Sequence, residues 1–228
     1  MLLKRWEDLP SFMQCDGVKE YYDILNRRKF SLLFKRLFDI FASIILLILL
    51  SPALLIVAIW IKLDSEGPVF YRQERITQYG RVFKIFKFRT MVTNADKIGT
   101  LVTLQNDSRI TKVGEKIRKC RLDEIPQLIN ILIGDMSFVG TRPEVKKYVD
   151  RYSDEMLATL LLPAGVTSKA SLMFRDEDEI LNHKVNENNP VDKVYVEEIL
   201  PQKMVYNLEY IKDFSFVGDI VLCIKTVI

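Results

Sequence analysis

Two adjacent carboxylates, Asp123 and Glu124, are the residues of this 228-residue chain whose types and spacing could most clearly do chemistry. Arg118 and Arg121 precede them, and Pro126 follows in the predicted first turn of a helix. A carboxylate that stays ionised among cations can attack phosphorus or hold Mg²⁺. Ordinary capping of the helix N-terminus is the alternative role of such a pair.

Basic residues surround this pair and favour a phosphate site. Residues 72–121 contain thirteen basic and four acidic side chains. Lys87 and Arg89 alternate with phenylalanines, so on a β-strand both would point to the same side; a solvated surface is the alternative. Arg142 precedes a proline that could begin a helix, where a guanidinium and free N–H groups bind phosphate well. These observations predict four phosphate-binding side chains: Lys87, Arg89, Arg118 and Arg142.

The elements that must position these side chains are short. The runs PVFY and RVFKIF, separated by turn-forming residues, predict a β-hairpin over residues 68–86. Residues 206–228 are too short and interrupted for a membrane span and predict an amphipathic or surface-lying helix. Three further helices are predicted: one that begins by Lys112 after a cap at Asn106, Asp107 or Ser108, one that begins near Asp123 and ends at Gly134, and one from Pro143 to just before Pro163.

The longest apolar segment, residues 40–61, contains no charged side chain. As a straight helix it would be about 33 Å long, enough to cross a hydrocarbon core of roughly 30 Å. Pro52 lacks an N–H and predicts a kink or break, and the Ser51 hydroxyl could bind a carbonyl that this break frees. Basic residues flank both sides, which fits a hairpin whose ends lie on one face. These residues leave a re-entrant helix and a membrane span equally open.

Composition limits the remaining function classes. Apolar residues make up 49% of the chain, and the net charge of +3 is too small to argue for nucleic-acid binding. Cys15, Cys120 and Cys223 are far apart, which predicts neither a disulfide framework nor a zinc site.

His183 has no partner that suggests a triad, and we expect it on the surface. Residues 1–34 predict a peripheral extension with a turn and a short helix.

With these residues in view, the sequence resembles the monotopic phosphoglycosyl transferases, the bacterial sugar transferases that use undecaprenyl phosphate. The resemblance runs from about Lys35 to Thr226 and depends on the motifs KRLFD, YRQERI, KIFKFRTM, SRITKVGEKIRKCRLDEIPQLINILIGDMSFVGTRPE and LPAGVTSKAS. It implies a helix-dominated α+β enzyme with a small β-hairpin and amphipathic interfacial helices. The expected division is an extension over 1–34, a re-entrant membrane helix over 35–62 bent at Ser51 and Pro52, and a catalytic domain over 63–228.

The resemblance also implies a reaction. Asp123 would attack the β-phosphorus of a UDP-sugar and release UMP, and undecaprenyl phosphate would then take the sugar phosphate from the aspartate. Glu124 would be the second member of the dyad and would assist with Mg²⁺ or with proton transfer. Lys87, Arg118 and Arg142 match basic positions of the family. The expected location is the bacterial inner membrane with the catalytic domain on the cytoplasmic face, and a homo-oligomer stays open.

Two features qualify that expectation. Thr141 stands where the family usually has proline, and the run after Pro163 differs from that of many members, so sugar recognition cannot be carried over. The rival interpretation is a non-catalytic membrane adaptor with a single span and a basic patch that binds anionic lipid.

Overall fold

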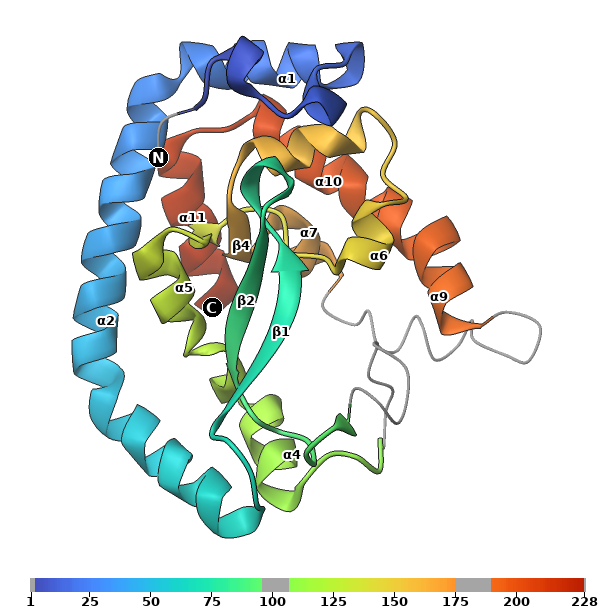
Figure 1. Cartoon of the computed structure of the whole chain (residues 1–228). Helices are drawn as coiled ribbons and strands as arrows, with labels where there is room; N and C mark the ends of the chain where they lie inside the picture. Colours follow the sequence, from blue (N-terminus) through green and yellow to red (C-terminus); the bar gives the residue numbers. More distant parts are fainter. Residues whose placement is uncertain (1–2, 96–106, 175–189, 228) are drawn as a thin grey trace.

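The computed structural model describes residues 3–95, 107–174 and 190–227, and helices predominate in it (Figure 1). The helices surround two small sheets. The longer helices are α1 (Asp16–Arg27), α2 (Lys29–Asp64), α4 (Lys112–Lys119), α5 (Gln127–Ile133), α10 (Leu200–Lys212) and α11 (Phe216–Val227). Short helical turns are η1 (Trp6–Asp8), η2 (Ser11–Met13), η3 (Gln78–Gly80), η4 (Leu122–Glu124), α6 (Lys146–Val149), η5 (Met156–Leu161), α7 (Lys169–Met173), α9 (Val191–Val194) and η6 (Tyr195–Ile199).

The predicted hairpin is confirmed. Strands β1 (Phe70–Ile76) and β2 (Val82–Phe88) pair antiparallel, and the register places Tyr71 opposite Lys87. Strands β3 (Met136–Val139) and β4 (Ala164–Thr167) form a separate parallel pair. Phe83 and Ile85 of β2 pack with α5, and so the hairpin lies directly beside the segment that carries the two carboxylates.

Helix α2 runs continuously through Pro52 and changes direction in its second half as it follows one side of the molecule (Figure 1). Pro52 leaves the carbonyl of Ile48 without its usual N–H partner, and the Ser51 hydroxyl donates to that carbonyl at 2.8 Å. The predicted contact of Ser51 is therefore confirmed, and α2 is not broken at Pro52.

The outer side of α2 is apolar and exposed. Only 11% of its most apolar 18-residue stretch is buried in the protein, which excludes a role as an ordinary core helix. Among the described residues, α2 is the one helix long and apolar enough to cross a membrane. The exposed side chains include Phe34, Phe41, Ile45, Ile48, Leu49, Leu55, Ile56 and Ile59.

Both ends of α2 are bound to the rest of the protein. Near its start, Lys35 is 2% exposed and donates to Asp219 of α11 at 2.6 Å. At its end, the Asp64 carboxylate accepts from the backbone N–H of Val113 in α4 at 3.2 Å. Val57 and Ile61 also pack with Ile117 of α4 in one buried cluster. Helix α2 and the elements that it contacts at both ends thus form one packed body.

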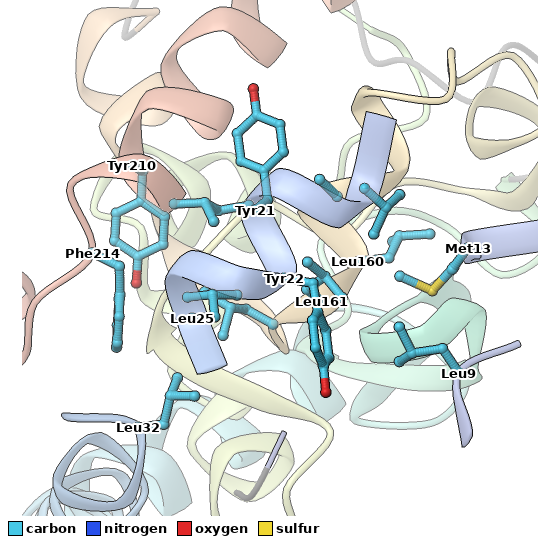
Figure 2. Packing of buried hydrophobic residues seen from close by; sticks show 14 of the residues in the cluster. Leu9, Met13, Tyr21, Tyr22, Leu25, Leu32, Leu160, Leu161, Tyr210 and Phe214 are labelled. Carbon is cyan, nitrogen blue, oxygen red and sulfur yellow. The ribbon is translucent and has the colours of Figure 1, made fainter. Parts of the chain in front are cut away.

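The N-terminal segment is part of the core rather than a peripheral extension. Leu9, Met13 and the buried face of α1 pack against η5, α10 and the start of α2 (Figure 2). Tyr21 and Leu25 are 1% and 0% exposed. The expectation of a peripheral role is therefore wrong, because the buried face of α1 meets apolar residues that are far away in sequence. Helix α2 also begins at Lys29, ahead of the boundary expected at residue 34.

Two other local predictions are corrected. The helix expected from Pro143 to Pro163 is replaced by extended residues, the single turn α6 and the 3-10 turn η5. The backbone of this segment bonds to strand β1 instead of forming a helix: the carbonyl of Glu144 accepts from the N–H of Ile76 at 2.9 Å. Helix α4 begins where predicted, but its cap is Thr111, whose hydroxyl accepts from Gly114. Asn106, His183 and the acidic residues 176–179 lie outside the described residues.

Candidate active site

One carboxylate oxygen binds two cations from two other elements. Oε1 of Glu124 accepts from Nζ of Lys87 at 2.9 Å and from an Nη of Arg142 at 2.7 Å. Lys87 comes from β2, Glu124 from η4, and Arg142 from the loop after β3. All three side chains are partly buried. The structure therefore brings together three of the side chains that the sequence predicts.

The turn that carries Asp123 and Glu124 has an unusual backbone at its start. Arg121, directly before it, has a left-handed conformation with φ of 54°, which is uncommon for a residue other than glycine. Arg121 lies between the end of α4 and the start of η4, where the chain turns from one helix into the other. Asp123 thus lies in a 3-10 turn just before α5, and Gly134 ends α5 with φ of 90°; both agree with the prediction.

Asn130 fixes α5 against the strand that carries Lys87. Its side chain is completely buried, and its Oδ1 accepts from the N–H of Phe86 at 2.8 Å. Its amide group donates to the carbonyl of Lys84 at 3.1 Å and to Asp135 at 3.3 Å. Sequence reasoning missed this residue, although a lone Asn within the apolar run QLINILI was a usable signal because buried amides need partners.

The electrostatics of the two carboxyl groups differ. Burial raises the pKa of Glu124, but Arg142 and Lys87 outweigh that effect and hold this pKa well below its usual range. Burial raises the pKa of Asp123 above its ordinary value; Lys87 and Arg118 oppose this rise, and the charge of Glu124 adds to it. The two cations therefore favour the ionised form of Glu124, whereas Asp123 is the less strongly paired carboxylate.

Lys87 is affected by the same neighbours. Burial lowers the pKa of its ammonium group, Glu124 opposes this change, and Arg142 reinforces it. Arg118, in the last turn of α4, is close enough to lower the pKa of Asp123 and also that of Asp107. Asp107 binds Arg109 through several contacts, and neither residue was predicted to lie near the site.

Arg89 lies apart from this group. Arg89 is 5% exposed, and its guanidinium donates to the carbonyls of Ser65 and Glu66, at 2.7 and 2.5 Å, just beyond the end of α2. Strand β2 ends at Phe88, although the N–H of Arg89 still donates to the carbonyl of Val69. Lys87 binds Glu124 whereas Arg89 binds the chain beyond the end of α2, so the two predicted phosphate ligands do not share a partner.

Mg²⁺ is compatible with the acidic residues present. The described residues contain no cluster of three or more acidic, histidine or cysteine side chains that could form a complete metal site. Mg²⁺, however, commonly binds to one or two carboxylates and takes its other ligands from water and substrate phosphates. Asp123 and Glu124 fit that pattern for a cation that arrives with a phosphorylated substrate.

Comparison with known proteins decides the family. The sequence profile described as bacterial sugar transferase matches residues 30–228. The chain belongs to the bacterial sugar transferase family. The resemblance expected from the sequence motifs is thereby confirmed, and the match includes η4, the β1–β2 hairpin and all of α2 except its first residue.

Three curated relatives of this family illustrate the similarity. The chain is 34% identical over 196 residues to UDP-N-acetylgalactosamine-undecaprenyl-phosphate N-acetylgalactosaminephosphotransferase of Aeromonas hydrophila, covering 85% of the chain and 42% of the relative. It is 36% identical over 200 residues to UDP-glucose:undecaprenyl-phosphate glucose-1-phosphate transferase of Escherichia coli K12, covering 86% and 39%. It is 32% identical over 208 residues to exopolysaccharide production protein ExoY of Sinorhizobium fredii, covering 85% and 83%. The chain thus spans about two fifths of the first two relatives and most of the third.

Proposed function

We propose that this chain is a phosphoglycosyl transferase that moves a sugar 1-phosphate from a UDP-sugar to undecaprenyl phosphate and releases UMP. The observation that carries the proposal is Glu124, which holds Lys87 and Arg142 next to Asp123 in a member of the bacterial sugar transferase family. The first two relatives are named as transferases of this reaction type, and the third as a protein of exopolysaccharide production. The reaction would begin the assembly of a bacterial glycan on its lipid carrier.

In the first step, an Asp123 oxygen attacks the β-phosphorus of the donor. A bond forms between this oxygen and phosphorus, and the bond from the β-phosphorus to the bridging oxygen breaks, so that UMP leaves with the bonding electrons. Lys87, Arg118 and Arg142 neutralise the charge of the diphosphate and of the leaving group. Glu124 keeps Lys87 and Arg142 in place for this task.

In the second step, a phosphate oxygen of undecaprenyl phosphate attacks the same phosphorus. The bond to Asp123 breaks, its carboxylate is restored, and the product is an undecaprenyl diphosphosugar. Asp123 and Glu124 would hold Mg²⁺, which when bound supplies further charge neutralisation on the diphosphate.

We propose further that α2 is re-entrant in the cytoplasmic leaflet of the bacterial inner membrane. Lys35 binds α11 and Asp64 binds α4, so both ends of α2 are attached to the same folded body. A straight span would have to separate these two ends by the thickness of the bilayer. The change of direction in the second half of α2, which contains Pro52, and the exposed apolar outer side support immersion from one face (Figure 1). Such a helix lets the enzyme reach a lipid phosphate and a cytoplasmic nucleotide sugar on the same side.

The test is turnover by the purified full chain in nanodiscs with Mg²⁺ and undecaprenyl phosphate. Each reaction contains one donor, chosen from UDP-N-acetylgalactosamine, UDP-glucose, UDP-galactose and other UDP-sugars, and the UMP that is released is measured. We expect UMP from at least one donor, and a phosphosugar adduct on the protein when acceptor is withheld. Binding to anionic vesicles without UMP from any donor would instead support the single-span adaptor.

A further inference from the structure

We propose that Arg89 and Asp64 are positioning residues that transmit the placement of the membrane helix α2 to the catalytic cations Lys87 and Arg118. This inference depends on the proposed function, because it concerns how the proposed active site is held. It assigns a role to Arg89, a predicted phosphate ligand that the structure places away from Glu124.

Arg89 binds the chain just beyond the end of α2 with both terminal nitrogens. Its two Nη atoms reach the carbonyls of Ser65 and Glu66, and one of them also donates to the Ser65 hydroxyl at 3.0 Å. The turn is shaped around this guanidinium: Gly67 has φ of 125°, and a Cβ there would lie 2.0 Å from an Arg89 nitrogen. A buried, forked set of contacts holds the backbone of Arg89 tightly.

Arg89 is only two residues after Lys87, so the contacts that hold Arg89 act on the chain next to a catalytic cation. The N–H of Arg89 also donates to the carbonyl of Val69, which continues the hairpin pairing one step beyond the strands. A shift of the end of α2 would therefore move the end of β2, where the ammonium of Lys87 meets Glu124.

A second connection leaves the same end of α2. The Asp64 carboxylate binds the N–H of Val113 in the first turn of α4, and Arg118 lies in the last turn of that helix. Ile61 of α2 and Ile117 of α4 belong to one buried cluster, together with Val113. The two segments that carry Lys87 and Arg118 are thus attached to adjacent residues at one end of the membrane helix, so the seating of that helix sets the spacing between the two cations.

The experiment is a double-mutant cycle on UMP release by the full chain in nanodiscs, with wild type, Arg89→Lys, Lys87→Met and the double variant. A lysine cannot bind both carbonyls with the fork geometry of arginine. We expect Arg89→Lys to lower kcat about 10- to 100-fold, with the KM for the UDP-sugar within about twofold of wild type. In the Lys87→Met background the same change should cost less than about threefold, because Arg89 acts through Lys87. Arg72→Lys, on the exposed side of β1, is the matched control and should stay within about twofold of wild type.

A second double-mutant cycle uses Asp64→Ala with and without Arg118→Met. It tests the inference if the Arg89→Lys protein does not fold and cannot be purified. Asp64→Ala should lower kcat about tenfold in the wild-type background and much less beside Arg118→Met. Equal factors in both backgrounds would overturn the inference, and a rise in KM that matches the loss in kcat would instead place Arg89 on the substrate. Absence of UMP from the wild type contradicts the proposed function and is distinct from either outcome.

Discussion

Lys87 and Arg142 converge on one oxygen of Glu124, from positions 37 residues before it and 18 residues after it. Neither cation neighbours Glu124 in the chain, so the arrangement exists only in the folded protein. It leaves Asp123, the adjacent carboxylate, close to the same cations but less strongly paired. We propose that their roles divide accordingly, with Glu124 orienting the cations and Asp123 acting as the nucleophile.

The nucleophile assignment predicts the behaviour of Asp123→Asn. The amide is a poor nucleophile, so UMP release should fall by at least about 10³-fold and no phosphosugar adduct should form. UMP release and intact-protein mass spectrometry measure both effects. Asp150→Asn, which changes only an exposed pair with Lys146, is the control and should be active. An active Asp123→Asn enzyme would refute the assignment.

The pH dependence of UMP release should reveal the coupling of Asp123 to Lys87. Asp123 must be ionised to attack, burial raises its pKa, and the Lys87 cation lowers it. Lys87→Met removes the lowering effect, so the carboxyl stays protonated up to a higher pH and the acidic limb of kcat/KM should move to higher pH. We also expect a loss of about 10- to 100-fold in kcat/KM on the plateau. Lys84→Met, on the same strand but exposed, should keep the wild-type pH profile. If the acidic limb of Lys87→Met does not move, Lys87 does not lower the pKa of Asp123.

Asn130→Ala should destabilise the fold at the junction of α5 and β2. The substitution leaves the Phe86 N–H and the Lys84 carbonyl without their side-chain partner, and each buried unpaired group costs about 1–3 kcal/mol. We expect the free energy of unfolding to fall by about 2–4 kcal/mol, measured by chemical denaturation in detergent. A loss below about 1 kcal/mol would mean that the amide does not hold the two elements together.

The buried pair Lys35–Asp219 should behave differently when one or both partners are replaced. Lys35→Met leaves an unpaired buried carboxylate and should cost about 3–5 kcal/mol of unfolding free energy. The double variant Lys35→Met/Asp219→Leu removes both charges and should be more stable than Lys35→Met. Thermal unfolding of the three proteins in one detergent provides the comparison, and additive losses would argue against the pair as the connection between α2 and α11.

The topology of α2 can be measured with single cysteines at positions 29 and 62, in a background where Cys15, Cys120 and Cys223 are serine. We expect a membrane-impermeant thiol reagent to label both positions from the cytoplasmic side only, and labelling from opposite sides would mean a true span. Pro52→Ala restores an N–H for the Ile48 carbonyl and should straighten the helix, which changes the labelling of position 62. Unchanged labelling would count against Pro52 as the bend.

Local sequence chemistry was sufficient for several elements. The hairpin, the start of α4 and the end of α5 at Gly134 follow from turn residues and apolar spacing that act over a few positions. The contact between Ser51 and Ile48 follows from what proline removes from a helix. Asp123 and Glu124, and Lys87 and Arg142 as predicted phosphate ligands, were also readable as candidate site residues from their types and neighbours, but the binding of both cations to Glu124 was not.

Tertiary structure decided the rest, since it depends on contacts between segments far apart in the chain. Arg89 was predicted to bind phosphate from the same side of a strand as Lys87, but its guanidinium binds two carbonyls just beyond the end of α2. The helix expected after Pro143 is lost because its backbone pairs with β1. The N-terminal segment becomes core because its apolar face meets η5 and α10. Local propensities are worth a few tenths of a kcal/mol per residue, whereas burial and long-range hydrogen bonds are worth about 1 kcal/mol or more each, and where the two conflict the tertiary contacts prevail.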